Sequence, residues 1–274
     1  MDKALLTYLE ALCARAYLVV YAPQESITGA IKRLFTHGIP QAVRRSAIPL
    51  LIGFLALFLG FFAGISLYFQ DQTWFYTFVD SGLSDGRAPG ASAEYLRSTL
   101  FDDDGLSDDY GNFGVFASYL FSHNTQIAIF IFALGVFITL PAFALTFYNG
   151  LMVGAFVGVF VENGLGYELF GWLSIHGVTE LSAICVACAG GAQLGLAILL
   201  PGDKPRRLAL LENGRDAVKL MILAGLMLVV AAVVEGFFRQ IVQDTEVRLA
   251  FGWGLGLLWL SWLLLSGREK DTPA

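Results

Sequence analysis

The segment AIPLLIGFLALFLGFFAGISLYF, residues 47–69, carries no charged side chain. A helix of about 20 apolar residues spans the roughly 30 Å hydrocarbon core of a bilayer. Comparable apolar runs recur along the 274-residue chain, which is 56% hydrophobic and 15% charged, with a mean hydropathy of +0.65. A soluble domain of this length needs more polar residues to cover its surface. The composition therefore predicts an integral membrane protein.

These apolar runs predict an all-α, polytopic bundle of about six transmembrane helices. They lie at residues 47–69, 125–147, 151–161, 176–200, 217–238 and 250–265, within a transmembrane domain assigned to 47–267. Pro141 is expected to kink the second span, and Asn149-Gly150 to form a tight turn after it. The stretch 162–175 is mixed in polarity and broken by glycines, so an interrupted helix is expected there.

Three segments lie outside the predicted spans. Residues 1–46 are amphipathic and contain six Lys and Arg, which predicts short helices at the cytoplasmic membrane surface. Residues 70–124 contain nine acidic and two basic residues and are assigned as an acidic extracytoplasmic segment. Its aspartates at 102–109 lack the regular spacing of a calcium loop, so a solvated loop is expected. Residues 268–274 are assigned as a cytoplasmic tail.

The distribution of Lys and Arg near the span ends predicts the orientation in the membrane. Six of them precede the first span, four lie in the loop 201–216 and two in the tail. Two lie in the 70–124 segment and two in the short loop 239–249. Because cytoplasmic loops carry the excess of positive charge, both termini and the loop 201–216 are expected in the cytoplasm.

Glycines four residues apart recur within the spans. Small residues at this spacing let helices pack closely in lipid, where water does not drive helices together. They are Gly60 and Gly64; Gly150, Gly154 and Gly158; Gly191 and Gly195; and Gly252 and Gly256. We favour intramolecular packing at these ladders, and the alternative is that one of them forms a homo-oligomer or partner interface.

Four polar residues fall inside or beside the apolar runs: Asn149, His176, Glu180 and Glu235. Ionisable groups in membrane spans are costly and usually face protein or a water-filled cavity. His176 and Glu180 are four residues apart and share a helix face, along which small residues continue. We expect at least three of the four side chains to line one interior region of the bundle.

Each of these residues also has a plainer interpretation. A buried hydrogen bond between His176 and Glu180 would fix the helix register without any further role. Asn149 would be an ordinary turn residue, and Glu235 would pair with Arg239 one helical turn later.

The sequence predicts neither a metal site nor a cofactor. His176 and Glu180 lie on adjacent helical turns, but no third and fourth ligand is evident and the H-E-x-x-H pattern is absent. Cys185 and Cys188 lie within an apolar run, where cysteines behave as small hydrophobic residues. No basic tract indicates binding to nucleic acid.

Six motifs follow one another between residues 47 and 265: HN at 123–124, FALG at 132–135, YNGLMVG at 148–154, HGVTELSAI at 176–184, AGGAQLG at 189–195 and AAVVEGF at 231–237. Together they resemble the stage II sporulation protein M family. The resemblance implies a non-enzymatic, multi-pass protein of the bacterial or archaeal cell (inner) membrane. In spore formers this family works with peptidoglycan-degrading proteins during engulfment and helps to localise them.

Three functions are weighed on this basis. The first is a scaffold that docks or localises cell-envelope partner proteins, in particular peptidoglycan hydrolases or the products of neighbouring genes. The second is a transporter or channel that uses Asn149, His176, Glu180 and Glu235, with the broken stretch 162–177 as an unwound substrate site. The third is an intramembrane hydrolase that uses His176 and Glu180. We favour the scaffold and place transport second.

Overall fold

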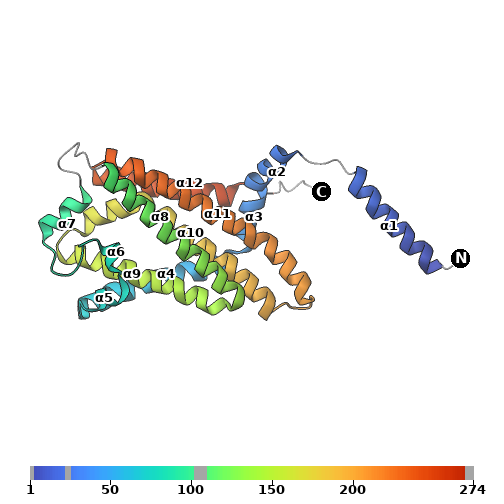
Figure 1. Cartoon of the computed structure of the whole chain (residues 1–274), viewed down its shortest axis with the longest axis horizontal. Coiled ribbons are helices and arrows are strands. Elements are labelled where there is room, and N and C mark those ends of the chain that lie inside the picture. Colours follow the sequence, from blue (N-terminus) through green and yellow to red (C-terminus); the bar gives the residue numbers. More distant parts are fainter. Residues whose placement is uncertain (1–2, 22–25, 102–109, 269–274) are drawn as a thin grey trace.

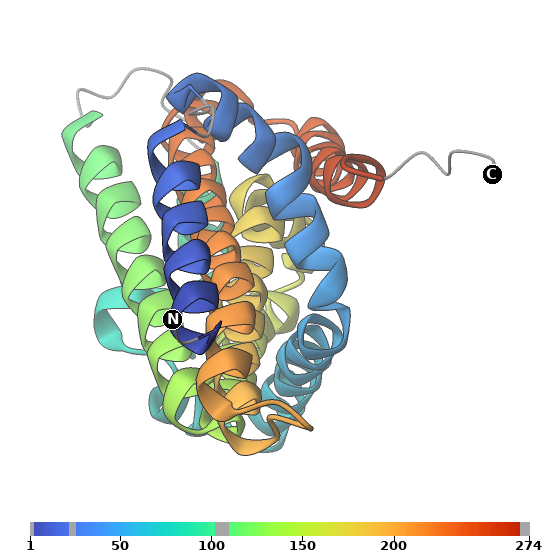
Figure 2. The ribbon, with the colours of Figure 1, turned by 90° about the vertical axis from the view of Figure 1, so that its right-hand side faces the viewer.

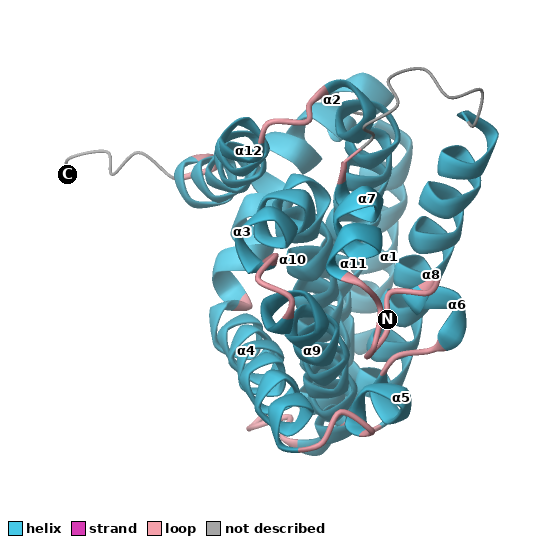
Figure 3. Ribbon diagram, turned by 90° about the vertical axis from the view of Figure 1, so that its left-hand side faces the viewer, coloured by secondary structure: helices cyan, strands magenta, loops and turns pink. Residues whose placement is uncertain are grey.

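The structure, a computed structural model, describes residues 3–21, 26–101 and 110–268. The helices are α1 (Lys3–Tyr21), α2 (Ile27–Arg33), the π-helical turn η1 (Leu34–Gly38), α3 (Ile39–Arg45), α4 (Ala47–Gln70), α5 (Trp74–Phe78), α6 (Ser81–Ser84), α7 (Ala93–Leu100), α8 (Tyr110–Phe137), α9 (Thr139–Glu162), α10 (Gly166–Leu199), α11 (Arg206–Ile241) and α12 (Thr245–Leu265). No strand occurs in these three stretches (Figure 3). The all-α prediction is therefore confirmed.

Helix α10 lies at the centre of the bundle. It packs against α11, α8, α12, α9 and α4 (Figures 1 and 2). Buried residues make up 72% of its most apolar stretch, against 22% for α4 and 17% for α12. Polar side chains on α10 are therefore shielded from lipid by its neighbours, whereas α4 and α12 turn most of their surface outward.

Five of the described helices are long and apolar enough to cross a membrane: α4, α9, α10, α12 and the part of α11 from Arg206 to Gly236. A sixth apolar helix, Phe121–Phe137 within α8, is shorter. These helices confirm a polytopic membrane bundle. Close glycine contacts run in parallel register between α4 and α9, and between α8, α10 and α12. Within each of these two groups the helices thus point the same way, as expected when successive helices of the chain cross a membrane in opposite directions.

The predicted boundaries of the second and third spans are wrong. Helix α8 ends at Phe137, Ile138 is extended (φ −146°, ψ 116°), and α9 then continues to Glu162. Pro141 lies in the first turn of α9, where the missing proline N–H has no intrahelical partner to lose. The predicted turn at Asn149-Gly150 is likewise wrong, because both residues lie in the middle of α9.

The stretch 162–175 is less broken than its glycines suggest. Only the residues between Glu162 and Gly166 leave the helical path, and Gly164 there adopts a left-handed conformation (φ +74°). Helix α10 then runs without interruption through His176 to Leu199. Gly171 is helical and packs closely on Thr245 at the start of α12. The unwound substrate site proposed for this stretch is therefore not formed.

The segment 70–124, expected to be a polar loop, is largely folded. Helices α5, α6 and α7 cover one end of the bundle (Figures 1 and 3), and we call residues 71–101 the outer cap, after the side of the membrane on which the sequence predicts them. Residues 110–124 belong to α8, and the aspartates at 102–109 lie outside the described residues. Five buried apolar side chains of the cap share a cluster with residues of α4, α9 and α10: Phe75, Phe78, Val79, Leu96 and Leu100.

The N-terminal region divides into two parts. Helix α1 stands apart from the bundle in Figure 1 and exposes Leu5, Tyr8 and Leu12. By contrast, α3 packs on α11 and α12 and buries Ile39 and Val43. Helices do precede the first span in both described parts, but α3 belongs to the packed bundle, and the location of α1 at the membrane surface stays a prediction.

The α4–α9 pair is held together by glycines on both helices. A Cβ atom added at Gly60 would lie 2.0 Å from the carbonyl oxygen of Phe147, and one at Gly150 would lie 2.2 Å from that of Leu57. Gly64 and Gly154 make equally close backbone contacts, and Gly158 packs on the ring of Tyr68. Only glycine permits this approach, so this ladder is occupied within the chain.

The remaining ladders join α10 to its neighbours. Gly191 meets the backbone of Phe132 on α8, and Gly195 meets the carbonyl oxygen of Gly135, where an added Cβ would be 2.2 Å away. On α12, a Cβ at Gly252 would lie 2.0 Å from the carbonyl oxygen of Ser174. These contacts fix the register of α10, which carries the polar residues considered next.

Candidate functional site

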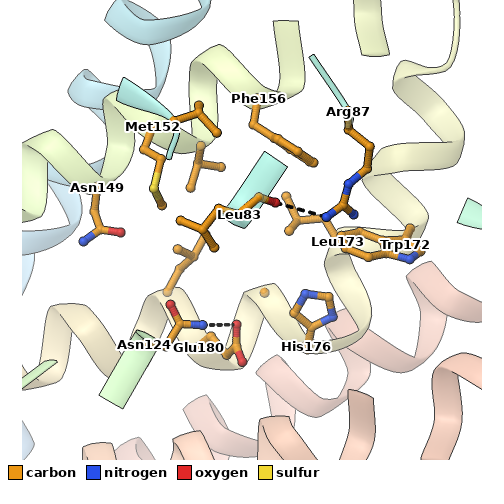
Figure 4. Close-up of a pocket in the computed structure, with 14 residues that line it drawn as sticks. Leu83, Arg87, Asn124, Asn149, Met152, Phe156, Trp172, Leu173, His176 and Glu180 are labelled. Carbon is orange, nitrogen blue, oxygen red and sulfur yellow. Dashed lines mark hydrogen bonds between the residues drawn. The ribbon is translucent and has the colours of Figure 1, made fainter. Parts of the chain in front are cut away.

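A cavity of about 100 Å³ lies beneath the outer cap, between α8, α9 and α10 (Figure 4). We call it the cap cavity. It is lined by Val79, Leu83, Arg87, Asn124, Asn149, Met152, Val153, Phe156, Trp172, Leu173, His176, Gly177, Glu180 and Leu181. Three of the four polar residues singled out in the sequence, Asn149, His176 and Glu180, are therefore brought to one interior region.

Glu180 is held by a residue of another helix. Its side chain is only 4% exposed, and its Oε2 atom accepts a 2.8 Å hydrogen bond from Nδ2 of Asn124 on α8 (Figure 4). The plainer interpretation, a bond from His176 to Glu180, is not what forms. Oε1 of Glu180 is buried and accepts no hydrogen bond from any residue in the described stretches. The carboxyl group is thus only partly satisfied by protein.

His176 packs beside an aromatic ring one turn earlier on α10. Its imidazole meets the indole of Trp172 edge-on, with ring centroids 5.2 Å apart. The imidazole is buried and lines the cap cavity together with Trp172. Its i, i+4 spacing to Glu180 places both on the cavity side of α10, although the two side chains do not bond.

Asn149 reaches the cavity from the opposite wall. It is 2% exposed and projects from the middle of α9, beside Met152 (Figure 4). Its amide makes no hydrogen bond with the part of the chain that the structure describes. The interpretation of Asn149 as a turn residue is therefore wrong, since it is a buried polar group in a continuous helix.

Glu235 does not line the cap cavity. It lies on α11, is 2% exposed, and shares a buried helix face with Ala224 and Ala231. Its carboxyl group is close enough to that of Glu180 for the two to interact electrostatically. Glu235 is thus a buried neighbour of Glu180, on a helix that packs against α10. Pairing with Arg239 stays a prediction, because that side chain lies outside the described part of the structure.

Arg87 is a cavity residue that the sequence interpretation missed. It is 3% exposed, and its guanidinium group donates to the carbonyl oxygens of Ser84 (2.9 Å) and Leu83 (3.1 Å). The same group lies 5.3 Å from the ring centre of Phe156 and 5.8 Å from that of Trp172. Such cation–π contacts are stronger when desolvated. Arg87 therefore fastens the outer cap to α9 and α10.

A second buried arginine fastens the other end of the cap. Arg248 near the start of α12 donates to the carbonyl oxygens of Leu100 (2.9 Å) and Val242 (2.7 Å) and to Oε1 of Gln243 (2.8 Å). Its guanidinium carbon lies 5.2 Å from the ring centre of Phe101. Arg87 and Arg248 both lie in segments that contain only two basic residues each. Apart from that scarcity, the sequence does not distinguish them from solvent-exposed arginines.

The polar groups do not form a recognisable metal centre. Within the described residues, no three side chains among His, Cys, Asp and Glu are grouped so that they could hold an ion. Cys185 and Cys188 are both buried in α10, and neither forms a disulfide. The cavity's polar lining consists instead of two amides, one carboxyl, one imidazole and the bound guanidinium of Arg87.

A search of curated proteins and a search of solved structures returned no match. In a comparison with protein families, residues 50–239 match the family described as Stage II sporulation protein M. The matched region runs from α4 almost to the end of α11, so it includes every helix that lines the cap cavity. On this match, the chain belongs to the Stage II sporulation protein M family.

Proposed function

We propose that this protein is a non-enzymatic membrane scaffold that docks cell-envelope proteins on its outer cap. The observation that carries the proposal is the fixing of the cap by two buried arginines, Arg87 and Arg248. Arg248 joins α12 to the cap through its hydrogen bond to the carbonyl oxygen of Leu100. Arg87 closes the cap on itself by donating to Ser84 and Leu83, and it contacts the bundle through the rings of Phe156 and Trp172. A loop without a binding role does not need a fixed conformation. A surface that docks a partner does, because the partner has to fit its shape.

The outer cap also exposes the residue types that protein interfaces use. Trp74, Tyr76 and Tyr95 are exposed on α5 and α7. Aromatic side chains are enriched at protein interfaces because they bury a large area at low entropic cost. The apolar side of the same helices is already used against the bundle. The partners that family membership favours are envelope proteins, including peptidoglycan hydrolases.

Site-specific photocrosslinking in native membranes tests this proposal. A photoreactive residue at Tyr76 or Tyr95 should give discrete crosslinks to envelope proteins. The control position is Leu55, which is also exposed but lies in the middle of α4, where the neighbour is lipid. Crosslinks at the cap positions that are absent at Leu55 support docking. The same products at all three positions, or none at the cap, would contradict it.

Transport is the second candidate, and the cap cavity favours it. A buried carboxyl and two amides in the interior of a membrane bundle are the groups that ion and solute pathways use. Purified protein in liposomes would then show solute or ion flux that Glu180→Gln abolishes. No flux over a broad panel of ions and small solutes, from protein that remains folded, rules this candidate out.

A further inference from the structure

We propose that the cap cavity binds a small protonated amine, with the oxygens of Glu180, Asn124 and Asn149 accepting its N–H groups. This site is independent of the scaffold function, which concerns the exposed side of the cap. It rests on three observations: a carboxyl group without a cationic partner, an amide without a partner, and a small cavity between them with mostly apolar walls.

The carboxyl group of Glu180 has room for a cationic partner, because its Oε1 atom accepts no hydrogen bond from the described residues. None of the ion pairs among the described residues includes Glu180, and its one hydrogen bond comes from the neutral amide of Asn124. Without a counter-charge, burial in the membrane interior favours the neutral carboxylic acid, and a bound cation would favour the carboxylate. The cation nearest to the cavity, Arg87, is held at the edge by Ser84, Leu83 and two rings. A bound cation would supply the missing charge.

The amide of Asn149 is available to form hydrogen bonds with a ligand in the cavity. Buried polar groups in folded proteins are almost always hydrogen-bonded to protein or to ordered water. Asn149 is 2% exposed and faces the cavity in Figure 4. Its side-chain amide makes no hydrogen bond with the described residues. Asn124 offers a second amide, whose oxygen is not used by the bond to Glu180. Both amides can accept N–H donors from a ligand.

The walls and size of the cavity select the kind of cation. Most of the lining is apolar, including Leu83, Met152 and Val153, and Phe156 and Trp172 add aromatic rings. Ca²⁺ and Mg²⁺ take about six oxygen ligands, which these walls do not provide, and no three His, Cys, Asp or Glu side chains of the described residues are grouped to hold another metal ion. An alkylammonium ion needs only a few acceptors, and its methyl or ethyl group gains from apolar and aromatic contacts. A volume of about 100 Å³ holds a few heavy atoms.

An anion fits the cavity poorly. An ionised Glu180 would repel it, and Glu235, which interacts electrostatically with Glu180, is a second acidic side chain. The guanidinium group of Arg87 also lines the cavity, but two of its N–H groups already donate to the carbonyl oxygens of Ser84 and Leu83. The acceptor oxygens and the apolar lining therefore favour a small organic cation.

Ligand titration of the purified full-length protein in nanodiscs tests the proposal. Methylammonium and ethylammonium chloride are the probes, with sodium and potassium chloride at equal ionic strength as controls. Binding is followed by calorimetry, by the thermal unfolding midpoint and by tryptophan fluorescence, since Trp172 lines the cavity. We expect saturable binding of the alkylammonium ions that raises the unfolding midpoint, and no such response to the two metal salts.

Two variants and one control locate the site. Glu180→Gln keeps the shape and removes the charge, and should weaken binding by roughly tenfold or more, as for a lost charged hydrogen bond. Val153→Phe fills the cavity while leaving every polar group in place, and should abolish binding in a protein that stays folded. Glu212→Gln makes the same change at an exposed carboxyl on α11 and should leave binding unchanged.

The proposal is overturned if folded wild-type protein binds neither alkylammonium ion, which would mean that the cavity holds only water. It is also overturned if sodium or potassium gives the same response, or if Val153→Phe binds as wild type does. The Val153→Phe result decides the location even where Glu180→Gln fails to fold.

Discussion

Asn124 and Glu180 show how a single hydrogen bond can join two helices in lipid. The bond connects α8 to α10 between two buried side chains, 56 residues apart in the chain. In a low-dielectric interior, leaving a buried acceptor without a donor costs more than the bond itself contributes. The same reasoning explains why Glu180 can be tolerated at all so deep within the bundle.

The variant Asn124→Leu should therefore destabilise the protein by about 1–3 kcal/mol, the cost of leaving a buried polar group unsatisfied. Reversible unfolding in mixed micelles measures it. The matched control is Gln126→Leu, two residues further along α8 at an exposed position, which should leave stability unchanged or raise it. Equal effects of the two substitutions would mean that Asn124 has no structural partner.

The residue patterns predicted the location of the polar groups better than their partners. His176 and Glu180 lie on the same face as a small-residue stripe, and that face does point into protein. The partner of Glu180 could not be predicted, because Asn124 is distant in sequence and helix-pair register depends on packing. Arg87 was missed for a similar reason, since nothing local marks a buried arginine within an acidic segment.

At the scale of helices, close glycine contacts account for the continuity of α9 through Asn149-Gly150. The apolar pattern cannot distinguish one continuous helix from two spans separated by Asn149-Gly150. Contact with α4 makes the difference, because Gly150 and Gly154 can approach its backbone only while α9 is a regular helix. The outer cap was not predicted either, because helices as short as α5 and α6 are stable only when packed.

Gly150→Ala should accordingly destabilise the α4–α9 pair. The added methyl group would lie 2.2 Å from the carbonyl oxygen of Leu57, so the helices must separate, at a cost of about 1–3 kcal/mol. Gly225→Ala on α11 is the control, because nothing lies within 4 Å of its added methyl group. Unfolding measurements that show no difference between the two variants would contradict the observed packing.

The outer cap gives a prediction of its own. Arg87→Gln removes hydrogen bonds and ring contacts from a buried guanidinium group, and should speed amide hydrogen exchange in residues 79–87 roughly tenfold or more. The control is Arg97→Gln, because Arg97 is exposed and its ion pair with Glu168 is long, at 3.5 Å. Unchanged exchange in Arg87→Gln would mean that the cap is held by its apolar side chains alone.

At the scale of the whole molecule, basic residues gather at one end of the bundle and the outer cap occupies the other. Arg44 donates to the carbonyl oxygens of Leu263 and Ser266, which ties the start of the first span to the end of the last. The loop between α10 and α11 lies at the same end, since Pro49 and Pro201 line one hollow. The positive-inside rule predicts that this end faces the cytoplasm.

Thiol labelling of intact cells tests this orientation. In a Cys13→Ser background, Tyr76→Cys in the outer cap should react with a membrane-impermeant maleimide, and Lys204→Cys should react only after the membrane is opened. The two native cysteines of α10 are buried and should stay silent. The reverse labelling pattern would invert the topology and place the cap in the cytoplasm.

The central claim is that the polar residues of α8, α9 and α10 face a cavity inside the bundle and not the lipid. Quenching by brominated lipids of single-tryptophan variants tests it most directly. Trp172 lines the cap cavity and is 3% exposed, while Trp253 is 49% exposed at a similar depth, beside Phe170. Strong quenching of Trp253 and little quenching of Trp172 is the predicted result, and quenching of both to the same extent would contradict it.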